Sequence, residues 1–124
     1  MWPTLLVAFG GVIGTVGRYW VAGLVQRLGG ADFPAGTLGV NLIGSFVLGL
    51  VMALSLERGL IGGEVRIALA VGVCGGFTTM STFSYETLAL LRDGEAALAL
   101  GNVGVTVLGC MAAVWLGGIT ARVL

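Results

Sequence analysis

Two adjacent glycines and a cluster of hydroxyl groups mark the segment from Gly72 to Glu86 as the part of this sequence best suited to chemistry. The segment reads GVCGGFTTMSTFSYE and holds five Ser and Thr hydroxyls and one carboxyl group. Hydroxyls and backbone carbonyls bind small ions and water, whereas the chain offers no nucleophile beside a base, no metal cluster and no cofactor motif. The segment therefore indicates an ion or water site, and an enzyme is not predicted.

The elements that carry this segment belong to a strongly apolar chain. Of its 124 residues, 57% are hydrophobic and 10% are charged, and the mean hydropathy is +1.06. Six Arg balance six Asp plus Glu, so neither a nucleic-acid surface nor a basic lipid-binding tail is predicted. Cys74 and Cys110 lack CxxC spacing, so we expect packing residues rather than a disulfide or a zinc site. The composition predicts a membrane protein.

Four stretches of the chain are long enough to cross a bilayer. A hydrocarbon core about 30 Å thick is spanned by roughly 20 apolar residues in a helix. No sequence remains for a second domain. We therefore predict an all-α membrane protein, with a single transmembrane domain over residues 1–124 and helices near 3–25, 37–56, 64–91 and 96–120.

The third predicted helix carries the polar segment, and we expect it to be broken at 75–79. A glycine pair followed by β-branched Thr weakens a helix, and backbone groups freed at membrane depth must bond to protein or line a site. In an antiparallel pair of chains, the freed carbonyls would converge into an all-oxygen cage for a hard monovalent cation. The alternative is a glycine kink in which Ser and Thr bond to carbonyls one turn earlier.

The positive charges give no clear membrane orientation. The six Arg divide evenly between the two ends of the helices, with Arg18, Arg27 and Arg92 against Arg58, Arg66 and Arg122. A chain without a bias can insert both ways, so we expect dual topology and an antiparallel homodimer. The alternative is one orientation fixed by another feature. Small residues four apart, such as Gly10 with Gly14, indicate close helix packing, most of it within one bundle.

Other polar residues lie at comparable depth on the remaining helices. Asn41 is on the second helix, and Asn102, Thr106 and Cys110 follow at four-residue steps on one face of the fourth. They either line a pore or join helices by hydrogen bonds. Arg18 either reaches toward the first loop or lines a vestibule that attracts anions, and Glu86 must be paired, hydrogen-bonded or protonated.

Three segments together resemble the bacterial fluoride channels of the CrcB, or Fluc, family. They are Gly14 to Arg18, the stretch GTLGVNLIG from Gly36 to Gly44, and the stretch GGFTTMSTFS from Gly75 to Ser84. The resemblance extends to chain length, number of spans and motif order. It implies an antiparallel dual-topology homodimer in the bacterial inner membrane, with two pores through which fluoride leaves the cell passively.

The resemblance also implies roles for individual residues. A structural sodium ion would lie at the dimer centre, bound by the backbone carbonyls of Gly75 and Thr78 from both copies, and Arg18 would lie at the vestibule. The pore and fluoride contacts would come from Asn41, Phe83, Met80, Ser81, Thr82, Ser84, Asn102 and Thr106. Met80 stands where the family usually has a second Phe, so a soft thioether replaces an electropositive ring edge.

Two other functions compete with a fluoride channel. A proton-coupled exporter of the small multidrug resistance type is equally short, but such exporters carry a Glu in the first helix and residues 3–25 hold no acidic residue. A structural membrane subunit would use its polar groups only to join helices. Convergent amide and hydroxyl donors suit a compact hydrated anion. The choice of fluoride over chloride rests on the resemblance.

Overall fold

Four helical spans build the chain, as the sequence predicts. The computed structural model describes all residues, 1–124, and has four helices long and apolar enough to cross a membrane. The spans are Trp2–Gly29, Ala35–Leu56, Gly63–Arg92 and Ala96–Val123. The first, second and fourth are the continuous helices α1, α2 and α6. Pro3 lies in the first turn of α1, where no hydrogen-bond donor is lost, and α1 continues to Gly29, beyond the predicted end at residue 25.

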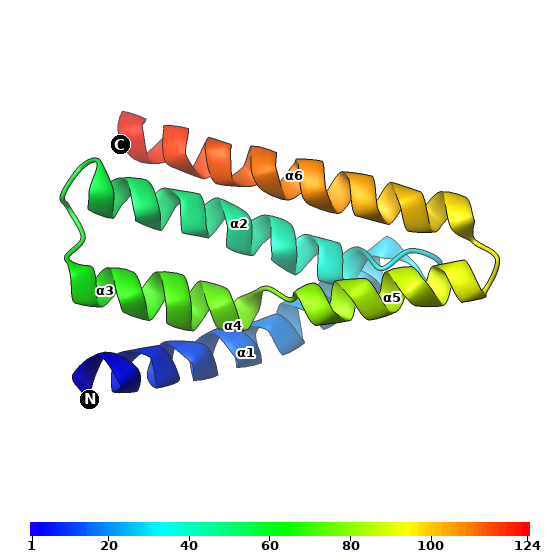
Figure 1. Cartoon of the computed structure of the whole chain (residues 1–124), viewed down its shortest axis with the longest axis horizontal. Helices are drawn as coiled ribbons and strands as arrows, with labels where there is room; N and C mark the ends of the chain where they lie inside the picture. Colours follow the sequence, from blue (N-terminus) through cyan, green and yellow to red (C-terminus); the bar gives the residue numbers. More distant parts are fainter.

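The third span is the only one divided into pieces (Figure 1). It comprises α3 (Gly63–Ile67), the π-helical turn η1 (Ala68–Cys74), α4 (Gly75–Phe77) and α5 (Met80–Arg92). The break is narrower than the predicted 75–79, because Gly75–Phe77 stays helical and only Thr78 and Thr79 leave the helix. The π-helical turn before the break was not predicted. π-helical turns inside α-helices are frequent at functional sites.

The spans pack as two close pairs, α2 along α6 and α1 against η1 and α4 (Figure 1). Glycines allow the helix backbones of both pairs to come close together. A Cβ atom at Gly117 of α6 would collide with the carbonyl oxygen of Phe46 in α2, and one at Gly14 of α1 would collide with that of Val73 in η1. Gly76 faces α1 in the same way, where an added Cβ would lie 2.8 Å from the oxygen of Gly11. The small residues four apart therefore pack within the chain, as expected.

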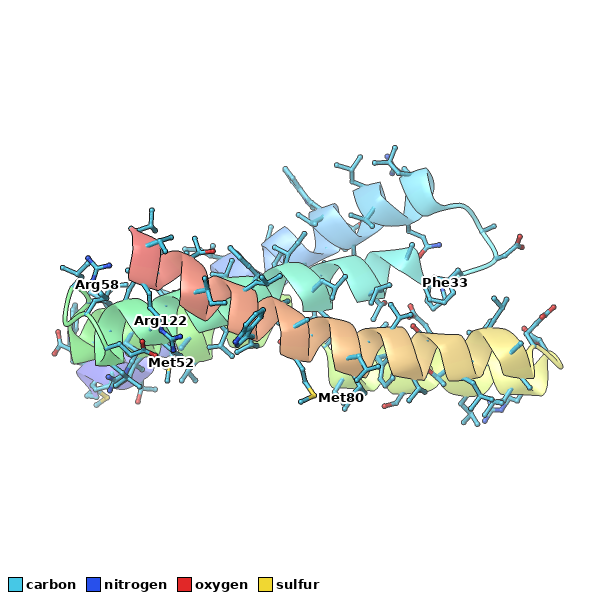
Figure 2. All side chains as sticks on the ribbon, turned by 90° about the horizontal axis from the view of Figure 1, so that it is seen from above. Phe33, Met52, Arg58, Met80 and Arg122 are labelled. Carbon is cyan, nitrogen blue, oxygen red and sulfur yellow. The ribbon has the colours of Figure 1, made fainter.

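Both chain termini lie at the same end of the bundle (Figure 1), and two Arg hold that end together. Arg58 donates to the carbonyl oxygen of Ala121 at 2.8 Å, close to the last turn of α6. Arg122 forms a two-bond pair with Glu57, at 2.7 and 3.0 Å, and its hydrogen bond lowers the pKa of that carboxyl. Figure 2 shows Arg58 and Arg122 together, with Phe33 at the other end.

Candidate functional site

The interruption of the third span is made by two extended threonines. Thr78 has φ −88° and ψ 161°, and Thr79 has φ −152° and ψ 118°. Both are β-region conformations, which β-branched residues favour. The N–H of Thr78 still donates to the carbonyl of Cys74 at 3.0 Å. The carbonyls of Thr78 and Thr79 and the N–H of Thr79 leave the helical ladder and need other partners.

Asn41 of α2 bonds to Thr79 in both directions. Its Nδ2 donates to the carbonyl oxygen of Thr79 at 3.1 Å, and its Oδ1 accepts from the N–H of Thr79 at 2.8 Å. Both groups are buried, and Asn41 is 8% exposed. A primary amide carries two N–H donors, so one donor remains for another ligand. Asn41 thus fastens the broken backbone to α2 while keeping one hydrogen free.

Arg18 of α1 bonds to the other threonine of the break. Its Nη1 donates to the carbonyl oxygen of Thr78 at 3.3 Å, and the side chain is half-buried. The guanidinium therefore reaches the middle of the third span instead of extending toward the first loop. Arg18 therefore satisfies a carbonyl that is released from the helix, and it brings a permanent positive charge to the break.

Thr79 also begins the next helix. Its Oγ1 accepts from the N–H of Thr82 at 3.2 Å, which is the usual N-cap bond. The same hydroxyl lies 3.1 Å from Oγ1 of Thr82 and 3.3 Å from Oγ of Ser81. The residue that ends one half of the span thereby starts the other half.

We expect Thr79→Ala to lower the free energy of unfolding by about 1 kcal/mol, because the N-cap bond of α5 is lost. Thr79→Ser, which keeps the hydroxyl, should retain most of the free energy of unfolding that the cap contributes. Unfolding by denaturant in detergent measures both. The matched control is Thr120→Ala on α6, whose hydroxyl bonds only to the carbonyl of Leu116 and is exposed. Equal losses for Thr79→Ala and Thr120→Ala would show that the cap is unimportant.

A cavity of about 340 Å³ opens along the break. Its 14 lining residues come from α2, η1, α4, the two threonines, α5 and α6, and none of them is charged. Amide and hydroxyl groups of Asn41, Ser45 and Thr106 share this wall with apolar side chains. The arrangement offers neutral hydrogen-bond donors among apolar side chains at mid-span.

The cavity brings together about half of the residues predicted for the site. Its lining includes Gly75, Thr78, Asn41, Met80, Phe83 and Thr106. Phe83 is buried at 8% exposure, whereas Met80 is 72% exposed. Ser81, Thr82 and Ser84 are exposed residues of α5 that do not line it. The hydroxyl of Ser84 bonds back to the carbonyl of Met80 at 2.9 Å.

Asn102 lies outside the cavity and joins two helices. Its Nδ2 donates to Oγ1 of Thr87 in α5 at 2.9 Å, and its Oδ1 accepts from Thr106 at 3.3 Å. The side chain is 1% exposed. Of the two roles that the sequence leaves open for Asn102, the geometry of the single chain favours the interhelical bond.

Glu86 has one hydrogen-bond partner, and its second carboxyl oxygen is buried without a partner. Its Oε1 accepts from the hydroxyl of Thr37 in α2 at 2.9 Å, whereas its Oε2 is buried with no hydrogen bond. The sequence indicates that a carboxyl at this depth needs a partner, but Thr37 could be identified only from the fold. Ser45 and Cys74 also line the cavity without having been predicted to do so. Cys110 lines it as well, and the sequence had placed it on the same polar face of the fourth helix as Thr106.

Comparison with known proteins gives one consistent result. Residues 5–118 match the family model described as "CrcB-like protein, Camphor Resistance (CrcB)". The chain is 45% identical to a protein of Geotalea uraniireducens over the full length of both, and 49% identical to one of Geobacter metallireducens over 98% of each. A protein of Geobacter sulfurreducens is 48% identical, again over the full length of both. Each of these relatives is named "Fluoride-specific ion channel FluC".

Proposed function

The chain belongs to the CrcB family, and from this premise we propose that it is a fluoride channel of the bacterial inner membrane rather than an enzyme. The four apolar spans make it a multi-pass membrane protein. Fluoride would cross passively, down its electrochemical gradient, and leave the cell. The family supplies the identity of the ion, and the geometry of the site supports a route for it.

One observation supports this function most directly, namely the uncharged cavity built around the broken third span. A bilayer tolerates an interrupted helix only where the freed groups bond to protein or line a polar path. Here Asn41 and Arg18 satisfy the freed carbonyls of the two threonines. The second amide hydrogen of Asn41 and the hydroxyl of Ser45 remain next to the cavity.

The composition of the cavity suits a small anion. None of its lining residues is a carboxylate, and the guanidinium of Arg18 bonds to the carbonyl of Thr78, a residue of the lining. Fluoride is compact and strongly hydrated, so a path must replace its water with convergent N–H and O–H donors. The buried ring of Phe83 adds an electropositive edge to this wall.

We place the exposed hydroxyls of α5 in the assembled channel rather than against lipid. Ser81, Thr82 and Ser84 are exposed in the single chain, and only 21 of its 124 residues are buried. Hydroxyls facing hydrocarbon are unfavourable, whereas an antiparallel second copy would cover them and continue the polar track. Two copies would then form two pores, with Arg18 in a vestibule that extends to each break and Thr106 farther along.

A structural sodium ion fits the same assembly. Gly75 and Thr78 both border the cavity, and their backbone carbonyls are neutral oxygen ligands of the kind that hard cations take. The carbonyl of Thr78 already accepts from Arg18, but a carbonyl oxygen has two lone pairs, so one is left for the ion. Two copies would supply four such oxygens at the dimer centre.

Ion efflux from liposomes tests the proposal. Purified protein would be reconstituted into liposomes loaded with potassium fluoride, and valinomycin would balance the charge that leaves. We expect a fluoride electrode to record rapid fluoride efflux. Liposomes loaded with chloride should retain their chloride. In detergent, light scattering should give the molar mass of two chains. Protein-free liposomes are the blank.

Three results would decide against the proposal. Chloride efflux as fast as fluoride efflux would remove the selectivity. Absence of any ion flux from correctly folded protein would favour a structural subunit. Saturable movement of organic cations driven by a pH gradient would favour a multidrug exporter, although α1 carries no acidic residue.

A further inference from the structure

A chain of three hydrogen bonds runs from the cavity at the break to the backbone of α5. Thr106 of α6, which lines the cavity, donates to Oδ1 of Asn102 at 3.3 Å. Nδ2 of Asn102 donates to Oγ1 of Thr87 at 2.9 Å, and Thr87 donates to the carbonyl oxygen of Phe83 at 2.7 Å. The chain thus links a residue of the cavity wall to Thr87, which does not line the cavity.

The direction of these bonds is set at Thr87. A threonine hydroxyl has one hydrogen, and that of Thr87 goes to a carbonyl oxygen, which can only accept. Thr87 must then accept from Asn102, so the amide nitrogen faces Thr87 and the amide oxygen faces Thr106. An amide turned the other way would place its oxygen against a hydroxyl oxygen whose hydrogen is already used. Thr106 therefore directs its own hydrogen at Asn102.

The cavity consequently meets an oxygen rather than a hydrogen at Thr106. With its only hydrogen given to Asn102, this hydroxyl has lone pairs alone to offer the cavity. Fluoride accepts hydrogen bonds and cannot donate them, so the hydroxyl in this state has no hydrogen for the ion, whereas a water molecule can bridge the two. The bond from Thr106 is the longest of the three, so it is the one that an anion would break first.

We propose that Thr87 is a positioning residue for the ion path, which keeps the hydrogen of Thr106 turned away from the cavity and so prevents a tight fluoride site there. Thr87 acts through Asn102 and does not touch the ion. Fluoride passes Thr106 with a water molecule between them. Conduction gains from this arrangement, because an ion that is held too tightly leaves slowly. This role rests on the proposed fluoride conduction, because it concerns how weakly the wall of that path holds the ion.

Fluoride efflux from liposomes loaded at a series of fluoride concentrations tests this role. Thr87→Val keeps the shape of the side chain but removes the hydroxyl, so the amide of Asn102 is free to turn and donate to Thr106, whose hydrogen then faces fluoride. One added hydrogen bond to a charged ion should lower the fluoride concentration for half-maximal efflux by about tenfold or more, and the maximal rate should fall. Thr87→Ser, which keeps the hydroxyl, should restore the wild-type concentration.

Two further variants show whether the effect passes along the chain of hydrogen bonds. In a Thr106→Val background, the shift caused by Thr87→Val should disappear, because no hydroxyl is left to turn toward the ion. Asn102→Leu frees the hydroxyl of Thr106 by another route. It should lower the half-maximal concentration as Thr87→Val does, and it provides the measurement if Thr87→Val does not fold.

Thr120→Val is the matched control. The hydroxyl of Thr120 bonds to the carbonyl four residues earlier on α6, as that of Thr87 does on α5, but it belongs to no chain of side chains. The half-maximal concentration should therefore stay unchanged in this variant. Wild-type concentrations in both Thr87→Val and Asn102→Leu, or an equal shift by Thr87→Val with and without the hydroxyl of Thr106, would overturn the role of Thr87 while wild-type efflux stands. A wild-type protein that releases no fluoride would overturn the proposed function and this role together.

Discussion

We expect Asn41→Asp to abolish fluoride flux in reconstituted liposomes, the largest functional effect of any single substitution considered for this chain. The change removes both amide hydrogens and leaves two acceptor oxygens. One of them would face the carbonyl oxygen of Thr79, to which Nδ2 of Asn41 now donates at 3.1 Å. The broken backbone then loses one of its two bonds to α2, while the N–H of Thr79 can still donate to the side chain, and the cavity gains a negative charge.

The magnitudes favour a complete loss. A carboxylate at mid-span costs about 3 kcal/mol relative to an apolar residue. If it stays ionised, a fluoride 4 Å away is repelled by about 4 kcal/mol at an effective dielectric constant near 20, which lowers its occupancy by roughly a thousandfold. Fluoride efflux and the elution volume of the variant would both be measured. An unchanged elution volume with no efflux indicates a folded but blocked channel, whereas a changed elution volume indicates an unfolded one.

Gln26→Glu is the matched amide-to-acid control. Gln26 bonds to the carbonyls of Gly30 and Phe33 after α1 and accepts from the N–H of Gly36 in the first turn of α2, and it does not border the cavity at the break. We expect this variant to keep most of its fluoride flux. A folded Asn41→Asp protein that conducts as fast as the wild type would contradict the role given to Asn41.

The largest effect on stability is expected from Gly117→Ala. A Cβ atom there would collide with the carbonyl oxygen of Phe46 and lie 2.9 Å from the backbone nitrogen of Leu50. Both are backbone atoms of α2 and cannot rotate away, so α2 and α6 must separate. Overpacking of this kind lowers the free energy of unfolding by about 1–3 kcal/mol, and by more where backbone blocks relaxation.

Gly118→Ala provides the control at the adjacent position. An added Cβ at Gly118 has nothing within 4 Å, and Ala is the better helix former by about 1 kcal/mol. Denaturant unfolding in detergent should therefore rank the proteins Gly118→Ala, wild type, Gly117→Ala in falling stability. Equal stability of the two variants would show that α2 and α6 do not approach each other as closely as the structure has them.

Several features of the fold follow from local sequence. The four spans were predicted because apolar runs of sufficient length have few alternatives in lipid, where every backbone group must be bonded. The break was predicted at 75–79 from the density of Gly, Ser and Thr, and it falls within that range, but its narrower extent was not predicted. Gly75 and Gly76 stay helical, with Gly76 packed closely against α1, and the two extended residues are the threonines that follow Phe77.

The partners of the polar side chains were beyond prediction from the sequence. That Asn41 bonds to Thr79, Arg18 to Thr78, and Asn102 to Thr87 depends on how each helix is rotated and shifted against its neighbour. The same rotation places Asn41, Phe83 and Thr106 at one cavity. Local sequence is enough to predict which segments cross the membrane and where a polar interruption falls, because lipid constrains every residue locally. Which groups meet depends on the packed fold, because those pairings arise from close backbone packing between residues far apart in the chain.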